Sequence, residues 1–403
     1  MARSHTTAAF AAAALLSAVL VLLLPSSAVA ATPGPLGTVR DAAVTFSGSG
    51  FLGVFHLGAL QQLQALGLDL SDGASGTSGG SLVSGLWCLG VPDNAATRLY
   101  AWVDDTCKSS WSCAGKLDKV VKQAMQQAVT DAMTAAASSS SKQPSLNPNN
   151  QADRDAFVRQ RCANKARFTV SKIARPTQLR HSEALKDATP VYVTDFTGEA
   201  DFVDAASASS FIPLFSGREA GLPAGQTWHT LFRGFAAADG GFSAPLPPCA
   251  PGAALCVKVV ATTDDKGKSG ASMLGSGKAG FALDSADIAP GKYSALPMGL
   301  TRDEWQMHAL AAPSDALAAA MQQHGRDQAL GWACQAFPKL MAGQQQGCAK
   351  FVVGGGGVQA PVQQQQQAQQ AQQPAMLPRR MMMPPALQQL VAAAVQPTQQ
   401  RVG

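Results

Sequence analysis

The pentapeptide at residues 76–80, Gly-Thr-Ser-Gly-Gly, places a serine between small residues. In this G-x-S-x-G pattern the small residues permit a sharp turn from a strand into a helix, which leaves the serine hydroxyl exposed for attack on a carbonyl carbon. The following helix adds partial positive charge at its N-terminus, and the Gly79 N–H group can donate to an oxyanion. The pattern therefore predicts Ser78 as the nucleophile of an acyl-transfer reaction, with Gly76 and Gly80 supporting the turn.

A second glycine-rich turn, at residues 48–53, spells G-x-G-x-x-G between a predicted strand and a predicted helix. Backbone N–H groups in such a turn can point at the negative oxygen of a tetrahedral intermediate with no side chain in the way. The two turns together predict an oxyanion hole, supported by Gly53 at the start of the helix. Its residues are Gly48, Ser49, Gly50 and Gly79.

Dinucleotide binding is the remote alternative for the turn at residues 48–53. That use requires an acidic residue about 20 positions on, at the end of a second strand. Asp69 and Asp72 lie near this distance, but a strand there would run directly into another glycine turn. An oxidoreductase that binds a dinucleotide is therefore the less favoured interpretation.

An acyl-transfer serine needs a base, and Asp239 is the best-placed acid. An apolar stretch leads into Asp239, and Gly240 and Gly241 follow it, so that backbone can crowd the carboxylate. An aspartate that only initiates a turn is the alternative.

A conventional triad would use a histidine as the base. The chain order serine, acid, histidine nominates His308 or His324, and His229 lies just before Asp239. His308 and His324 stand in a segment rich in Ala and Gln with no glycine turn to present them. We expect both to be surface residues of a helix.

The elements around these motifs alternate between strands and helices. A short apolar strand precedes each glycine turn and an apolar helix follows it, which is typical of an α/β fold with a mainly parallel sheet. Predicted strands lie at residues 44–46, 168–173, 191–196 and 257–262, and predicted helices at residues 54–66 and 81–89.

Four motifs occur in an order that resembles the patatin-like phospholipases, and within them most closely the branch of adipose triglyceride lipase and adiponutrin. The resemblance covers residues 44–262, which we take as the enzyme domain. It rests on residues 47–58, 76–80, 209–213 and 239–241.

The resemblance implies a three-layer α/β/α sandwich with a mainly parallel central sheet. It also implies hydrolysis of the acyl esters of acylglycerols or phospholipids by a dyad of Ser78 and Asp239, with no histidine, metal or other cofactor. The expected partners are a lipid substrate and a lipid–water interface. A relative that binds lipid but has lost activity is the alternative. Two departures from the family pattern are Gly79, where alanine is usual, and serine at positions 47 and 49, where the plant storage type has glycine.

The N-terminal residues 1–30 resemble a secretory signal peptide. Arg3 precedes an apolar run at residues 8–24, and Ala-Val-Ala at residues 28–30 matches a cleavage site. A retained membrane anchor or a plastid-type transit peptide are the alternatives. We therefore expect the secretory pathway or secretion, and otherwise association with a membrane or lipid droplet, or a plastid.

The eight cysteines fit an oxidising compartment. Three pairs are close enough in sequence to close short loops, which leaves Cys88 and Cys162 over, although eight cysteines allow 105 connectivities. The three pairs are Cys107 and Cys113, Cys249 and Cys256, and Cys334 and Cys348.

Three further segments complete the predicted organisation. Residues 123–152 contain Ala and Ser runs and indicate a helix leading into a flexible insertion. Residues 290–343 form a trailing helical segment with a break at residues 313–315. Residues 344–403 are rich in Gln, Pro and Gly, which predicts a disordered tail.

The charge balance argues against a nucleic-acid partner. The net charge is +5, but the basic residues are not gathered into a stripe and aromatic residues make up only 6% of the chain. The sequence indicates no particular protein partner.

Overall fold

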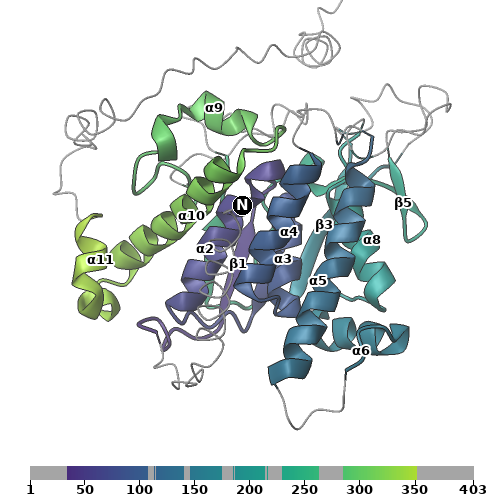
Figure 1. Ribbon diagram of the computed structural model, residues 1–403, viewed down its shortest axis with the longest axis horizontal. Coiled ribbons are helices and arrows are strands. Elements are labelled where there is room, and N and C mark those ends of the chain that lie inside the picture. The colour runs from purple at the N-terminus through teal and green to yellow at the C-terminus, as the bar shows by residue number, and fades with distance from the viewer. Residues whose placement is uncertain are drawn as a thin grey trace, which may run out of the picture. The chain divides into compact units, whose positions relative to one another are not determined.

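The computed structural model describes residues 34–107, 113, 115–139, 146–174, 185, 187–213, 216, 229–262 and 285–351 (Figure 1). The predicted signal peptide at residues 1–30 and the predicted tail after residue 351 lie outside these residues. Within the described part of the chain, no helix combines the length and the apolar character that crossing a membrane requires.

A mixed seven-stranded sheet organises the fold, in the order β5-β6-β3-β2-β1-β7, with β4 also paired to β3. Neighbouring strands are parallel from β7 through β1 and β2 to β3, whereas β4 and β6 are antiparallel to β3 and β5 is antiparallel to β6. The predicted α/β fold is confirmed, but the sheet is mixed where we expected a mainly parallel one, because β4 and β6 pair with β3 in the antiparallel direction and β5 and β6 form an antiparallel pair. The strands are β1 (Ala42–Phe46), β2 (Gly73–Thr77), β3 (Ala166–Lys172), β4 (Thr189–Val193), β5 (Thr230–Phe232), β6 (Phe235–Asp239) and β7 (Leu255–Val259).

The two strands β2 and β6 share one edge of β3. Phe168 of β3 pairs with both β2 and β4, and Val170 pairs with both β6 and β4. Because a strand has only two edges, β4 fills one and β2 and β6 follow each other on the other. β2 runs parallel to β3 and ends at Thr77, and β6 runs antiparallel and ends at Asp239. The carboxyl ends of β2 and β6 therefore meet.

Helices connect and cover the strands. Strand and helix alternate as predicted over residues 42–89, whereas several helices in succession precede β3 and β5 is followed directly by β6. The trailing segment forms two α-helices separated by the predicted break. The helices are α2 (Gly53–Ala65), α3 (Gly79–Leu89), α4 (Asp93–Thr106), α5 (Leu117–Ser139), α6 (Gln151–Cys162), α8 (Glu199–Ser209), α9 (Arg302–Met307), α10 (Asp315–Ala336) and α11 (Gln345–Ala349).

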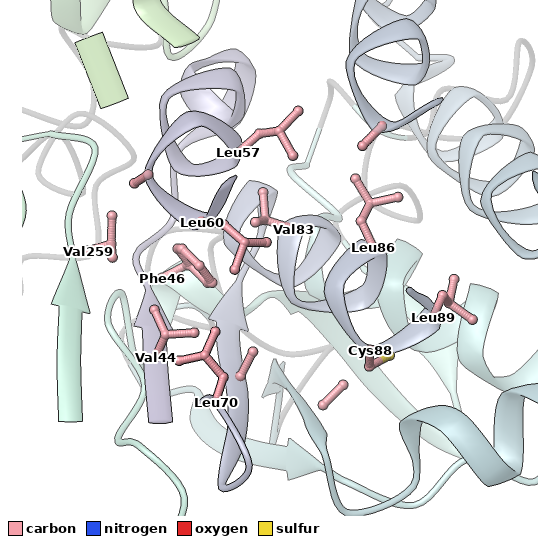
Figure 2. Packing of buried hydrophobic residues seen from close by; sticks show 14 of the residues in the cluster. Val44, Phe46, Leu57, Leu60, Leu70, Val83, Leu86, Cys88, Leu89 and Val259 are labelled. Carbon is pink, nitrogen blue, oxygen red and sulfur yellow. The ribbon is translucent and has the colours of Figure 1, made fainter. Parts of the chain in front are cut away.

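The main core lies between the sheet and the helices. Figure 2 shows Val44 and Phe46 of β1 packed with Leu60 of α2 and Val83 of α3. Alternate residues of a strand point to opposite faces, and on the other face Thr45 donates a hydrogen bond to the carbonyl oxygen of Pro247 at 2.6 Å. The segment after β6 thus covers the face opposite the main core at this point.

The trailing helix α10 packs directly on α2 (Figure 1). Two glycines allow the close crossing: a Cβ on Gly58 would lie 1.9 Å from the carbonyl oxygen of Gln322, and a Cβ on Gly325 would lie 2.1 Å from that of Phe55. The trailing segment is therefore part of the packed fold.

The helix predicted within residues 123–152 is present as α5, whose residues Met125, Val129 and Met133 are buried in the core because they recur at helical spacing. Residues 140–145, where we predicted a flexible part, lie outside the described residues. One predicted boundary is wrong, because order continues past residue 344, where we predicted the tail to begin. The helix α11 follows, and Phe351 is buried.

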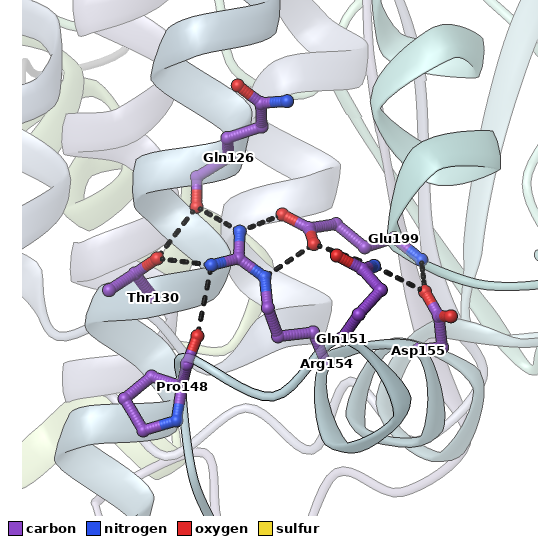
Figure 3. Close-up of polar contacts among 7 residues, drawn as sticks. All are labelled: Gln126, Thr130, Pro148, Gln151, Arg154, Asp155 and Glu199. Atoms are coloured by element: carbon purple, nitrogen blue, oxygen red, sulfur yellow. Dashed lines mark hydrogen bonds and ion pairs between the residues drawn. The ribbon is translucent and has the colours of Figure 1, made fainter.

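Arg154 ties α5, α6 and α8 together (Figure 3). Its guanidinium group binds both carboxylate oxygens of Glu199 at the start of α8, and it donates to the Thr130 hydroxyl and to the carbonyl oxygen of Pro148 at 3.2 and 3.1 Å. The hydrogen bond to Glu199 raises the pKa of Arg154 despite partial burial. This clamp holds α5 against its neighbours.

All eight cysteines form disulfides. The three short pairs proposed from spacing are present. The expectation that Cys88 and Cys162 are left over is wrong, because they join α3 to the end of α6. Spacing could not indicate this pair, since 74 residues separate its members.

We predict that the Cys88–Cys162 disulfide contributes more stability than the short ones. Because the entropy lost by the unfolded chain grows with loop length, Cys88→Ala with Cys162→Ala should lower the free energy of unfolding by about 4 kcal/mol, against about 2 kcal/mol for Cys249→Ala with Cys256→Ala. Urea denaturation of the two double variants measures the difference. Equal losses would contradict a role for the long link in stability.

Candidate active site

Ser78 stands at the turn between β2 and α3 in a strained backbone conformation. Its φ and ψ angles are 54° and −127°, a region that residues with side chains rarely adopt. Such a conformation costs about 1–3 kcal/mol and persists only where the surroundings enforce it. The geometry is that of a nucleophile elbow, as the G-x-S-x-G pattern predicted.

The elbow closes because its flanking residues have no side chains. A Cβ on Gly76 would lie 2.2 Å from the carbonyl oxygen of Gly80, and a Cβ on Gly80 would lie 2.5 Å from that of Ser47. Residues 73–77 form β2, the strand that leads into this turn. The sequence of this buried strand, Gly-Ala-Ser-Gly-Thr, has only one of the β-branched residues that usually indicate a strand, Thr77.

Asp239 is the last residue of β6, and hydrogen bonds fix both its side chain and its carbonyl oxygen. Its Oδ1 atom accepts from the Gly241 N–H group at 2.7 Å, and its carbonyl oxygen accepts from the Ser171 hydroxyl at 2.7 Å. Gly240 lets this end approach β3, since a Cβ there would lie 2.2 Å from the carbonyl oxygen of Thr169. The Oδ2 atom is buried and makes no hydrogen bond with any described residue. One carboxylate oxygen is thus fixed and the other is free to accept a proton.

The pKa of Asp239 suits a base that works near neutral pH. Burial raises this pKa from 3.8 to about 6, and the Ser78 side chain and the Gly241 N–H group offset part of the rise. The Ser78 hydroxyl therefore lies near the carboxylate without a fully formed hydrogen bond. Catalytic hydrogen bonds are often long without substrate and tighten when it binds.

The turn at residues 209–213 ties both reactive residues to the sheet. The Ser209 hydroxyl accepts from the Ser78 N–H group at 3.1 Å and donates to the carbonyl oxygen of Thr169 at 2.6 Å. The carbonyl oxygen of Phe211 accepts from the Asp239 N–H group at 2.8 Å. Residues 211 and 212 are not in a strand, and Ile212 lines a cavity at Ser78.

The turn at residues 48–53 lies against the elbow. Gly50 has φ of 52°, and a Cβ there would lie 1.8 Å from the carbonyl oxygen of Ala309. The Gly48 N–H group is engaged, because it donates to the carbonyl oxygen of Pro245 at 2.9 Å. The N–H groups of Ser49, Gly50 and Gly79 have no acceptor among the described residues. Three of the four predicted oxyanion residues thus have backbone N–H groups without an acceptor here, and Gly50 and Gly79 also line the cavity at Ser78.

The Ser49 side chain fills the space next to Gly79. A Cβ on Gly79 would lie 2.3 Å from the Ser49 Oγ atom and 2.8 Å from the carbonyl oxygen of Gly50. The serine hydroxyl therefore occupies the space that an alanine at position 79 would need. The two departures from the family pattern at these positions are physically coupled.

An apolar cavity of about 70 Å³ opens at Ser78, several times the roughly 10–15 Å³ that one water needs. Gly50 and Gly79 line it beside Ser78. Ala309 and Leu310, which follow α9, also line it. Sequence analysis missed these two residues because no motif marks them. Gly53 packs against Tyr100, which also lines the cavity, since a Cβ on Gly53 would lie 2.6 Å from the Tyr100 hydroxyl oxygen.

None of the three nominated histidines is bonded to Asp239 among the described contacts. His308 contacts the carbonyl oxygen of Ala311 through Nδ1 at 3.2 Å. His324 is buried, not exposed as predicted, because α10 packs on α2; its Nε2 atom accepts from the Gly291 N–H group at 3.3 Å. Burial lowers the pKa of His324 to about 4. Burial also lowers the pKa of the half-buried His229.

The features required for dinucleotide binding are not brought together. β2 ends at Thr77 and leads into Ser78, and Asp69 forms an ion pair with Arg40 at 3.0 Å. No cluster of three or more His, Cys, Asp or Glu residues suited to a metal ion occurs in the described ranges.

Comparison with protein families matches residues 44–248 to the family described as Patatin-like phospholipase. Comparison with curated proteins gives no match.

Solved structures give distant likenesses. VipD from Legionella pneumophila is 15% identical with a TM-score of 0.42, and the match covers 73% of this chain and 66% of that chain. The type III effector protein ExoU is 12% identical with a TM-score of 0.29, covering 79% of this chain and 61% of that chain. ExoU in its complex with SpcU from Pseudomonas aeruginosa is 12% identical with a TM-score of 0.31, covering 78% and 60%. This chain thus spans about 60 to 66% of the lengths of these solved chains.

We predict that Ser78→Gly is more stable than Ser78→Ala. Both variants lack the hydroxyl, but only glycine adopts a φ of 54° without strain. The expected advantage is about 1 kcal/mol in free energy of unfolding, because part of the strain relief is offset by the greater freedom of glycine in the unfolded chain. Chemical denaturation of the two variants measures it. An alanine variant as stable as the glycine variant would contradict the strained elbow.

Proposed function

Because this chain belongs to the patatin-like phospholipase family, we propose that it is a lipid acyl hydrolase in which Ser78 is the nucleophile and Asp239 is the base. The observation that carries this proposal is the meeting of β2 and β6 on one edge of β3, which brings the Asp239 carboxyl group near the Ser78 side chain. The Oδ2 atom of this carboxyl group has no hydrogen-bond partner among the described residues.

The first half of the reaction transfers the acyl group to Ser78. Asp239 Oδ2 takes the hydroxyl proton as Ser78 Oγ attacks the ester carbonyl carbon. The N–H groups of Gly50 and Gly79 donate to the oxyanion that forms, and the N-terminus of α3 adds partial positive charge. When the tetrahedral intermediate collapses, the bond to the alcohol oxygen breaks and the proton passes from Asp239 to that oxygen.

The second half releases the acid. A water molecule gives a proton to Asp239 as the water oxygen attacks the acyl carbon. The bond between the acyl carbon and Ser78 Oγ then breaks, and Ser78 Oγ regains the proton from Asp239. A serine hydroxyl is far less acidic than a carboxyl group of pKa about 6, so the proton moves only as the oxyanion becomes stabilised. Each oxyanion donor can contribute about 3 kcal/mol.

The substrate class is an acyl ester of an acylglycerol or a phospholipid at a lipid–water interface. The apolar cavity beside Ser78 supports an acyl chain as the bound part of the substrate. Within the family we propose the branch of adipose triglyceride lipase and adiponutrin, on the motifs at residues 47–58. We also propose the secretory pathway as the location, which the four disulfides support.

We predict that Ser78→Ala and Asp239→Asn each abolish turnover. Radiolabelled phospholipid, triacylglycerol and lysolipid are offered to each purified variant, and circular dichroism confirms the fold. Replacements His229→Ala, His308→Ala and His324→Gln should each cost less than about tenfold in kcat/KM, or under roughly 1.4 kcal/mol of barrier.

A folded histidine variant as inactive as Ser78→Ala would show a triad and overturn the assignment of Asp239 as the sole side-chain base. Lipid binding without turnover by the wild-type chain would favour the alternative of an inactive relative.

We predict that kcat rises with pH and levels off above an apparent pKa of about 6, because Asp239 must be ionised to accept the proton. The stability effect has the opposite sign. Because the pKa of Asp239 is raised in the folded state, the native state holds the proton more tightly than the unfolded chain does. This proton binding stabilises the fold fully below about pH 4, and the stabilisation is lost as pH rises through about 6.

At pH 8, the free energy of unfolding of Asp239→Asn should therefore exceed that of the wild type by up to about 3 kcal/mol. Thermal denaturation measures this as a higher melting temperature. At pH 4 the two should be closely similar. A rate profile independent of pH between 5 and 8, with no stabilisation of the variant at pH 8, would contradict a buried Asp239 base.

A further inference from the structure

The cavity at Ser78 continues between three helices. Its walls are apolar apart from the hydroxyl groups of Ser78, Tyr100 and Ser210. The helical residues that line it are Gly79, Leu82 and Leu86 of α3, Leu99, Tyr100 and Val103 of α4, and Leu117, Val121, Ala124 and Met125 of α5.

These residues recur every three or four positions on each helix, so each helix presents one continuous face to the cavity. Leu117 of α5 packs in the cluster of Phe51 beside the oxyanion turn. Eight residues further along α5, the Met125 Cε atom lies 2.8 Å from the place that a Cβ on Gly85 of α3 would take. α5 and α3 therefore run in the same direction, and the cavity is a slot between them that leads away from Ser78.

The slot has a closed end at Leu86 and Met125. One turn beyond them lie Leu89 of α3 and Val129 of α5, which are buried in the main core and do not line the slot. Figure 2 shows Leu86 and Leu89 on α3, with Cys88 of the Cys88–Cys162 disulfide between them in sequence. The core beneath the slot is therefore packed.

The length of the slot follows from the helix rise. From Ser78 to Leu86 is eight residues, or about 12 Å along α3 at 1.5 Å per residue. An extended chain advances about 1.2 Å per bond, as it does along a polypeptide backbone, so this length holds about ten carbon atoms.

We propose that this slot binds one straight acyl chain of about ten carbons and that Leu86 and Met125 set that limit. The proposal rests on the proposed hydrolase function and adds the substrate class, esters of medium-length acyl chains. The acyl carbon lies at Ser78 and the methyl end lies against Leu86 and Met125. The alcohol part of the ester stays outside the slot.

The test measures kcat/KM of the full-length chain on p-nitrophenyl esters of straight acids with 2 to 16 carbons. Below the limit each added methylene should raise kcat/KM about threefold to fourfold, because it buries one more CH₂ group. Above about ten carbons the increase should stop.

Three variants identify the walls of the slot. Met125→Ala should move the limit to longer chains. Val121→Phe should restrict turnover to the shortest esters, whose hydrolysis shows that the variant is folded. Met133→Ala is the matched control, since Met133 is a buried methionine two turns further along α5 that does not line the slot. Its chain-length profile should equal that of the wild type.

A second readout does not depend on hydrolysis. Calorimetric binding of free fatty acids of the same lengths to Ser78→Ala should show the same limit, shifted again by adding Met125→Ala. Hydrolysis with no limit near ten carbons, or a limit that Met125→Ala and Met133→Ala move equally, overturns the slot and leaves the hydrolase function standing. A limit in fatty-acid binding without hydrolysis of any ester supports the slot and overturns the hydrolase function.

Discussion

One edge of β3 holds the carboxyl ends of two strands that run in opposite directions, and the rest of the site depends on this arrangement. β2 delivers Ser78 and β6 delivers Asp239, although 160 residues separate them in the sequence. The turn at residues 209–213 fastens both to β3 through Ser209 and Phe211. The mixed sheet thereby brings Ser78 and Asp239, the proposed nucleophile and base, together at the ends of two strands.

The fold holds the Ser78 backbone and the Asp239 carboxyl group in states that neither residue would adopt in an unfolded chain. Ser78 keeps a strained backbone, and burial keeps the Asp239 carboxyl group partly protonated near pH 6. Both features cost stability, which the packed helices, the Arg154 clamp and four disulfides offset. Strain and a raised pKa commonly persist at sites where they serve a reaction.

The sequence predicted the sharp turns at Ser78 and Asp239 better than the elements that bring the two residues together. The patterns around Ser78 and Asp239 are local, because each turn depends on adjacent glycines. The bounds of β2 were not predicted, because its sequence has low strand propensity and it is a strand only through burial between β1 and β3. The contact of Ala309 with the oxyanion turn and the Cys88–Cys162 disulfide join distant segments, which no local pattern indicates. The role of α5 as a wall of the slot was hidden by its Ala-rich composition.

The measurement that tests the account most directly is the site of labelling by a fluorophosphonate, which reacts only with an activated serine. Peptide mass spectrometry of the labelled full-length chain should find the adduct on Ser78, with the labelling rate rising with pH around an apparent pKa of about 6. The same reagent should leave Asp239→Asn unlabelled over the same time. No adduct on Ser78, or equal labelling in the folded Asp239→Asn variant, would contradict a nucleophile activated by Asp239.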